Sequence, residues 1–386
     1  MIKKICIVTG TRAEFGQLSW LIDKINTDPE FTLQLIVTGM HLSPEFGSTF
    51  NEIIDAGYII TKKIEIQLSS DSSIGISKSM GLAQISFADA FDQLKPDLVV
   101  ILGDRTEMLA IASSALVFGI PIAHIHGGEI TEGVYDNSIR HAITKMSSLH
   151  FTSTEIYRNR VIQMGEDPKS VFNVGALAIE SVLNLKLFTR EEFEKSINHK
   201  LFSKNLLITF HPVTLENNSA CEQFTQLLEA LDELKDTLLI FTKPNSDKDG
   251  RIIIQLIDEY VQIHSKKAIA FTSLGQQRYL SAIPLMDAVV GNSSSGIMEV
   301  PALNIPTINV GDRQKGRIMG PTIFNCEPEK EAISKTINKA YQFDKSIRWD
   351  HPYGKGNTSS QILEILKNTG KINLKKTFYN IQPDKK

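Results

Sequence analysis

The stretch KICIVTGTRAEFG, residues 4–16, contains the pattern from which the rest of the chain is built. Its run Ile5–Val8 is apolar throughout, as in a strand that is covered on both faces. A turn follows, and Gly16–Asn26 then has the apolar spacing of a helix. This order of strand, turn and helix predicts the first unit of a parallel α/β sheet.

The same alternation of short apolar runs and helical segments, such as Ser86–Leu94, recurs along the first half of the chain. The further strand candidates there are Leu35–Thr38, Leu98–Leu102, Pro121–Ile125, Leu149–Thr152 and Val171–Val174. The pattern then restarts with Leu206–Phe210, Leu238–Thr242, Ala268–Thr272, Ala288–Gly291 and Thr307–Val310. We therefore predict an α/β fold of two doubly wound, Rossmann-like domains that face each other across a cleft.

The length of 386 residues suits two domains better than one. We place an N-terminal domain at residues 1–185 and a C-terminal domain at residues 186–360. The amphipathic segment Ile362–Lys367 predicts a last helix in a C-terminal segment, residues 361–386, that packs back on the first domain. Ligands of open α/β sheets bind at the carboxyl ends of the strands, so functional residues should follow strands.

Composition narrows the function classes. The chain is 42% hydrophobic and 22% charged with a formal net charge of −3, which indicates a globular protein without general attraction for nucleic acid or anionic membranes. No apolar run reaches the roughly 18 to 20 residues that span a bilayer, and the start MIKKICIVTG is too short for a signal peptide. Three distant cysteines, Cys6, Cys221 and Cys326, indicate reduced thiols. We expect a cytoplasmic protein.

Two strand ends in the first half carry polar side chains. Gly10 and Gly16 permit close backbone approach to a ligand, and Arg12 can face an anion near a helix start. The spacing is neither GxGxxG nor a P-loop, so a tight turn with a surface arginine is the alternative. Further on, LGDRTE puts Asp104 and Arg105 side by side, where an ionised pair is costly unless it is partnered or functional. A helix cap with a salt bridge is the alternative here.

The densest group of titratable side chains lies in HIHGGEITEGVYDNSIRH, residues 124–141. On a strand, His124 and His126 would point to the same face. The group continues with Glu129, Glu132, Asp136, Arg140 and His141. So many titratable groups at one strand-to-helix junction favour proton transfer. One alternative is a solvated polar loop with core histidines. Another is a zinc site, but thiolates and a clear third ligand are missing, so we predict no metal.

The second half contains a candidate anion site in VVGNSSSGIMEVP, residues 289–301. An apolar strand runs into the turn Asn-Ser-Ser-Ser-Gly, which ends at Gly296, and a helix follows. Amides and hydroxyls at a helix N-terminus bind an anion without a lysine. Glu299, one helical turn further on, could accept both hydroxyls of a ribose. An ordinary helix cap is the alternative.

Two further segments follow strands in the second half. His211, in LLITFHPV, is either a structural histidine or a phosphate or acid/base group that faces the first domain. The segment NVGDRQKGR, residues 309–317, carries Arg313, Lys315 and Arg317, which could neutralise phosphate or form a solvated basic loop.

Together these segments resemble the hydrolysing UDP-N-acetylglucosamine 2-epimerases of bacterial sialic acid and capsule synthesis. The resemblance covers nearly the whole chain through TGTRAEFG, VTGMH, LGDR, HIHGGE, DNSIRHAITKMS, FHPVT, GNSSSG and GDRQKGR. It implies a GT-B-like pair of domains, a cytoplasmic homodimer or homotetramer, and no redox cofactor. It also implies that UDP is eliminated from UDP-N-acetylglucosamine to give a 2-acetamidoglucal, to which water adds to give N-acetylmannosamine.

The resemblance also assigns residues. It implies that Arg12 and Arg105 line the UDP-sugar site, that Asp104 is an essential acid, and that His211 lies near phosphate. Diphosphate and ribose contacts are implied for Ser293, Ser294, Glu299 and Arg313, with Gly10 and Gly296 in the same turns. Second-domain positions near the nucleotide are implied for Asn245 and Leu274.

The chain departs from the wider family at two positions. His126 stands where many members have glutamate, although the capsule branch is similar to this chain in having histidine, and Asn137 replaces a frequent carboxylate. A histidine titrates near neutral pH without a large shift. We hypothesise that Asp104, His126, Glu129 and Asp136 share the acid/base work and that Arg140 orients them. The sequence leaves open which group takes the C2 proton.

Three other functions stay open on the sequence. The first is a hydrolysing 2-epimerase for a UDP-2,4-diacetamido-trideoxyhexose in legionaminic acid synthesis. The second is a GT-B glycosyltransferase, against which the many proton-transfer groups of residues 124–141 argue. The third is a nucleotide-sugar sensor, which would bind without turnover.

Overall fold

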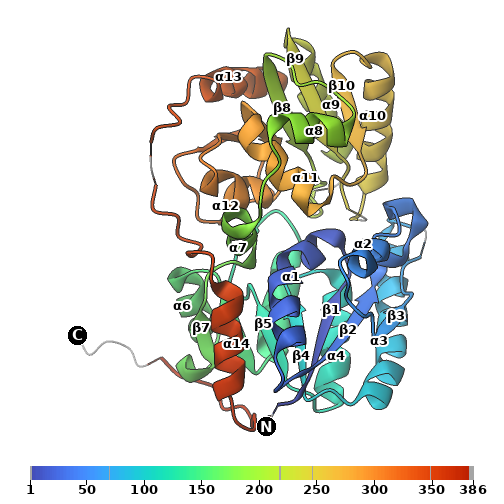
Figure 1. Cartoon of the computed structure of the whole chain (residues 1–386), viewed down its shortest axis with the longest axis vertical. Helices are drawn as coiled ribbons and strands as arrows, with labels where there is room; N and C mark the ends of the chain where they lie inside the picture. Colours follow the sequence, from blue (N-terminus) through green and yellow to red (C-terminus); the bar gives the residue numbers. More distant parts are fainter. Residues whose placement is uncertain (1, 69, 217–218, 246, 348, 382–386) are drawn as a thin grey trace.

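The computed structural model describes residues 2–68, 70–216, 219–245, 247–347 and 349–381. Two lobes are stacked along the long axis of the molecule, and each lobe contains one parallel sheet with helices on both faces (Figure 1). The predicted α/β fold with two Rossmann-like domains is therefore confirmed.

The first sheet has the order β3-β2-β1-β4-β5-β6-β7, with all neighbours parallel. Its strands are β1 (Lys4–Thr9), β2 (Thr32–Thr38), β3 (Lys62–Ile64), β4 (Leu98–Leu102), β5 (Ile122–Ile125), β6 (Leu149–Thr152) and β7 (Val171–Asn173). Its helices are α1 (Arg12–Thr27), α2 (Phe50–Asp55), α3 (Ser73–Leu94), α4 (Thr106–Val117), α5 (Asp136–Met146), α6 (Glu155–Gln163) and α7 (Leu177–Asn184).

The second sheet repeats this topology in the order β10-β9-β8-β11-β12-β13, again with parallel neighbours. Its strands are β8 (Lys204–Thr209), β9 (Thr237–Thr242), β10 (Ala268–Phe271), β11 (Ala288–Gly291), β12 (Thr307–Val310) and β13 (Ile323–Cys326). The remaining helices are α8 (Arg190–Ile197), α9 (Ser219–Asp232), α10 (Gly250–Ile263), α11 (Gly275–Ala282), α12 (Ser295–Ala302), α13 (Lys330–Ala340) and α14 (Thr358–Asn368).

Two strands, β3 and β13, were not among the predicted ones, and both lie at a sheet edge. The three residues of β3 read Lys-Lys-Ile, and only Ile64 is buried. None of the four residues of β13 is fully buried. An edge strand is solvated on one side, so it lacks the continuous apolar run that identified the central strands.

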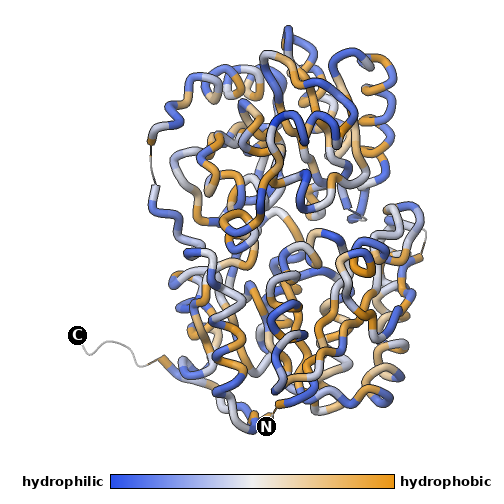
Figure 2. The backbone as a smooth tube through the Cα atoms, viewed as in Figure 1, coloured by the Kyte–Doolittle hydropathy of each residue, from blue (hydrophilic) through white to orange (hydrophobic). Residues whose placement is uncertain are grey.

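Each sheet has its own hydrophobic core, visible as orange segments in the interior of both lobes (Figure 2). Helix α1 shows how the sequence builds it. Leu18, Leu21, Ile22 and Ile25 are fully buried at the spacing of one helix face. The helix begins with a capping box in which the Thr11 hydroxyl and the Glu14 carboxylate each accept a backbone N–H of the other residue.

The chain connects the lobes twice. After β7 it passes through α7 into the second lobe, and we place the proposed domain boundary here, near residue 185. It returns before α14, which packs against α1 and α7 (Figure 1). The two connections lie side by side, because Ala176 N donates to Tyr353 O at 2.7 Å. Gly175 and Gly354 permit this close approach. Of the predicted C-terminal segment, residues 382–386 lie outside the described residues.

Candidate active site

The loops that follow the topological switch points of the two sheets face each other. Strand order reverses between β1 and β4 in the first sheet and between β8 and β11 in the second, and ligands bind at such points. Side chains from both lobes come together there. Arg105 Nη1 donates to Asp247 Oδ1 at 3.5 Å, and His211 Nδ1 lies 3.9 Å from Asp247 Oδ2. The loops that follow these strands therefore form one cleft.

The larger space in this cleft, which we call the central pocket, has an empty volume of about 950 Å³ that is partly open to solvent. Residues of α1 form one wall, and the ends of β8, β9 and β11 form the other. The predicted residues that line it are Arg12, His211, Asn245, Ser293, Ser294, Glu299 and Arg313. Helix α12 begins at this wall with Ser295, so the amides of its N-terminus lie beside the pocket. The pocket suits an anionic ligand.

Four other predicted ligands do not line the central pocket, and one of them, Arg105, lines a second cavity described below. Leu274 is fully buried in the core of the second lobe. Gly296 is packed against β12, where an added Cβ would lie 2.8 Å from Thr307 Cγ2. Gly10 instead makes room for a carboxylate, because a Cβ there would lie 2.7 Å from Glu107 Oε1. The places of these three residues are set by packing between neighbouring elements, which the motif alone does not reveal.

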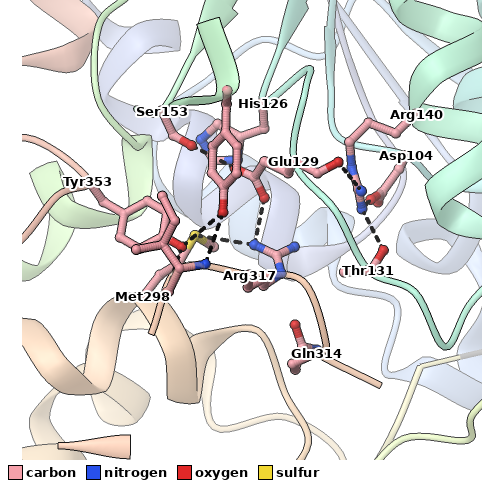
Figure 3. A network of polar contacts seen from close by, with 12 residues as sticks. Asp104, His126, Glu129, Thr131, Arg140, Ser153, Met298, Gln314, Arg317 and Tyr353 are labelled. Atoms are coloured by element: carbon pink, nitrogen blue, oxygen red, sulfur yellow. Dashed lines mark hydrogen bonds and ion pairs between the residues drawn. The ribbon is translucent and has the colours of Figure 1, made fainter. Parts of the chain in front are cut away.

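Asp104 and Arg140 form an ion pair at the first-lobe side of the cleft (Figure 3). Arg140 is almost fully buried, and it also donates to Thr131 Oγ1 at 3.1 Å and to the Glu129 carbonyl at 2.9 Å. Asn137 Oδ1 is a fourth acceptor, at 3.4 Å. A guanidinium that makes this many hydrogen bonds is typical of a group that fixes a loop. Arg140, on α5, therefore holds Asp104, at the end of β4, in one orientation.

Glu129 lies in a second buried ion pair, with Arg317 of the other lobe (Figure 3). Arg317 Nη1 donates to Glu129 Oε2 at 2.5 Å, and Ser153 Oγ donates to Oε1 at 2.8 Å. Burial raises the pKa of Glu129, but Arg317, His126 and Arg140 outweigh it and lower the pKa to about 2. The carboxylate is therefore ionised at neutral pH. Arg317 faces Glu129, and the side chain is not among those that line the central pocket.

Contrary to the prediction, the two histidines of HIHGGE do not lie on one face of a strand. β5 ends at Ile125, and His126 has a positive φ of 67°, so its side chain leaves the plane of the strand. His124 is a core residue, with Nε2 bonded to the Gly103 carbonyl at 2.7 Å. His126 Nδ1 lies 3.8 Å from Glu129 Oε1, and burial lowers its pKa. We call Asp104, His126, Glu129, Arg140 and Arg317 the polar cluster.

Asp136 begins helix α5 and lines a second space, which we call the side cavity. This cavity has an empty volume of about 600 Å³, also partly open to solvent. Burial and the charges of Asp104 and Asp247 raise the pKa of Asp136 to about 7. Arg105, Tyr135 and Asp247 line the same cavity. Asp136 is therefore a carboxyl group that can gain and lose a proton near neutral pH.

Three acidic residues of the site were not predicted. Asp247 links Arg105 to His211, and Glu107 accepts a hydrogen bond from Arg105 Nε at 2.7 Å. Glu14 accepts the Gly10 amide at 2.7 Å, and burial beside Glu107 raises its pKa to about 8. The T-x-x-E capping signature could have identified Glu14. Asp247 lies after the carboxyl end of β9, where ligand-binding residues were expected. This position was the only feature of the sequence that pointed to Asp247.

Neither a metal cluster nor a membrane-spanning helix occurs in the described part of the chain. No group of three or more His, Cys, Asp or Glu side chains there is arranged to hold a metal ion. None of the helices described is long and apolar enough to cross a membrane.

Comparisons with known proteins agree on one family. The sequence profile of UDP-N-acetylglucosamine 2-epimerase matches residues 23–367. GDP/UDP-N,N'-diacetylbacillosamine 2-epimerase (hydrolyzing) of Campylobacter jejuni is 47% identical over 342 residues, 88% of this chain and 89% of that protein. Polysialic acid biosynthesis protein P7 of Escherichia coli is 40% identical over 387 residues, 98% of each chain.

A solved structure shows the same fold. The UDP-GlcNAc 2-epimerase of Methanocaldococcus jannaschii, in complex with UDP-GlcNAc and UDP, superposes with a TM-score of 0.80 at 22% sequence identity. The match covers 95% of this chain and 100% of that one. The profile match, these relatives and the paired sheets together show that the chain belongs to the UDP-N-acetylglucosamine 2-epimerase family.

Proposed function

We propose that this protein is a hydrolysing 2-epimerase that releases UDP from a UDP-linked 2-acetamido sugar. The observation that carries the proposal is Asp136, a carboxyl group with a pKa of about 7 that lines a cavity next to the central pocket. Removal of a proton from a sugar carbon needs a base poised near the working pH. Family membership supports the nucleotide sugar as substrate and argues against the glycosyltransferase alternative.

In the proposed first step, Asp136 takes the proton from C2. The bond between C1 and the phosphate oxygen breaks, its electron pair leaves with UDP, and a C1–C2 double bond forms. Arg313 and the amides and hydroxyls around Ser293 and Ser294 stabilise the charge on the departing diphosphate. His211, whose pKa burial lowers to about 3, stays neutral and can donate one hydrogen bond to the same group.

In the proposed second step, water adds to the 2-acetamidoglucal. Asp104, held beside Arg140, accepts a proton from the attacking water while the oxygen of this water bonds to C1. Asp104 then passes this proton to C2 on the face opposite Asp136, so C2 is inverted and Asp104 is a carboxylate again, and Asp136 loses its own proton to solvent. Glu129 is ionised in its pair with Arg317, so we assign it a positioning role for His126 and the loop.

Two substrates fit this chemistry. UDP-N-acetylglucosamine, expected from the sequence, would give N-acetylmannosamine for sialic acid synthesis. A UDP-2,4-diacetamido-trideoxyhexose is the second candidate, favoured by the 47% identity to a diacetylbacillosamine 2-epimerase.

The test is incubation of the purified protein with each UDP-sugar in deuterated buffer, followed by proton NMR. We expect free sugar with inverted C2, deuterium at C2, and released UDP. Asp136→Asn should slow the reaction at least about a hundredfold, whereas Asp89→Asn, at an exposed aspartate on α3, should leave it unchanged. Product without deuterium at C2, or no turnover of either sugar, would overturn the proposal.

A further inference from the structure

The side cavity has two chemically different walls. One wall is charged and polar and belongs to the proposed reaction centre, with Arg105, Asp136 and Asp247. The other wall comes from the segment that follows β3 and from the first turns of α3. Its apolar side chains are Ile66, Leu68, Ile76 and Met80, and Gln67 and Ser79 lie among them. The proposed steps on C1 and C2 use Asp136 of the first wall and no residue of the second. The second wall therefore has no role in these steps.

The geometry of a pyranose ring gives this second wall a role. C1 carries the diphosphate, which the central pocket would hold, and C4 lies directly across the ring from C1. The central pocket and the side cavity meet where Asp247 faces both His211 and Arg105. A sugar that bridges this junction therefore directs its C4 substituent away from the nucleotide and into the side cavity. C6, which is attached to the neighbouring carbon C5, turns the same way.

We propose that the apolar wall of the side cavity reads the C4 and C6 substituents and selects a sugar with a 4-acetamido group and a 6-methyl group. This inference rests on the proposed function. Methyl groups of the acetamide and of C6 gain from contact with Ile66, Ile76 and Met80. The hydroxyls at C4 and C6 of N-acetylglucosamine carry no methyl group to bury against these side chains, so that sugar lacks this gain.

Polar groups in the same wall fit the amide of the 4-acetamido group. The half-buried Gln67 carries both a donor and an acceptor. Ser79 Oγ accepts the Leu68 amide at 3.1 Å, so its own hydroxyl hydrogen remains to be donated. The wall thus combines apolar surface with one or two hydrogen-bonding groups, as small-molecule sites do.

The test compares kcat/KM for UDP-2,4-diacetamido-2,4,6-trideoxyglucose and for UDP-N-acetylglucosamine in one enzyme preparation. The ratio of the two values is unaffected by the fraction of active enzyme, so a partly misfolded variant still gives an answer. We expect the wild-type protein to prefer the diacetamido sugar by roughly tenfold or more, the discrimination that small apolar groups provide.

Two variants on α3 place the preference in this cavity. Ile76→Asn puts a polar group into the apolar wall and should lower the ratio at least about fivefold, mainly through loss of activity on the diacetamido sugar. Ile74→Asn is the matched control, because Ile74 is exposed on the same helix and does not line the cavity. It should leave the ratio unchanged.

The outcomes separate this inference from the proposed function. Turnover of both sugars with equal or better kcat/KM for UDP-N-acetylglucosamine overturns the inference and leaves the 2-epimerase intact. A ratio that Ile76→Asn does not change, or that Ile74→Asn changes equally, also overturns it. Absence of turnover for both sugars overturns the proposed function itself.

Discussion

The central pocket and the polar cluster lie in the same cleft but are built in different ways. The wall that holds Ser293, Ser294 and Glu299 comes from one short segment, in which strand, turn and helix follow directly. The polar cluster joins residues far apart in sequence, such as Glu129 and Arg317, from both lobes. An anion can thus be bound by local backbone geometry, whereas orienting a set of charged groups requires the tertiary structure.

The largest expected effect belongs to Asp136. If it is the base, Asp136→Asn should lower kcat by about 10² to 10⁴-fold, because the amide cannot accept the C2 proton. The KM should change little, since the central pocket is untouched. The measurement is steady-state release of UDP. A kcat within threefold of wild type would remove Asp136 from the mechanism and move the reaction to the polar cluster.

The next effect tests whether the polar cluster depends on both lobes. Arg317→Met leaves the buried Glu129 carboxylate without its partner, which costs about 3 to 5 kcal/mol of stability. We expect a lower midpoint in urea unfolding. The double variant Glu129→Gln with Arg317→Met should recover part of the loss, because no buried charge is then left unpaired. An unchanged midpoint for Arg317→Met would mean that the lobes do not require this pair.

The pH dependence of kcat/KM follows from the raised pKa of Asp136. The base must be ionised in the free enzyme, so activity falls as pH drops through about 7 and is retained above it. Well below that pH the loss approaches about tenfold per pH unit. The measurement is kcat/KM at constant ionic strength from pH 5 to 8.5. Activity that stays constant down to pH 5, as an ordinary carboxyl group would give, would show that Asp136 is not the titrating base.

The smallest effect belongs to the central pocket. Ser294→Ala removes one hydroxyl among several groups around the diphosphate, and one neutral hydrogen bond contributes about 0.5 to 1.5 kcal/mol. We expect UDP to bind roughly three to ten times more weakly in calorimetry, with kcat nearly unchanged. Ser77→Ala, at an exposed serine on α3, is the control. A large fall in kcat would mean that this serine acts in the transition state.

The contrast also explains what could be predicted from the sequence. The central strands and the Ser293–Ser294 turn were predictable, because each is determined by a short apolar run and its adjacent turn. The pairing of Glu129 with Arg317 and of Arg105 with Asp247 was not, because 188 residues separate the first pair and 142 the second. The strand β3 was missed because two of its three residues, Lys62 and Lys63, are lysines, so that it forms no apolar run.

The paired connections at Ala176 and Tyr353 limit how the two lobes can move. A domain attached by one flexible segment can rotate in every direction. Two segments that are hydrogen-bonded side by side oppose twisting and permit mainly bending about one axis. The lobes should therefore open by a hinge rotation about an axis at these two segments. The route for substrate and product then lies at the opposite edge, near α2 and α10 (Figure 1). Arg251 of α10 and Glu45 of the first lobe form a surface ion pair at 3.0 Å.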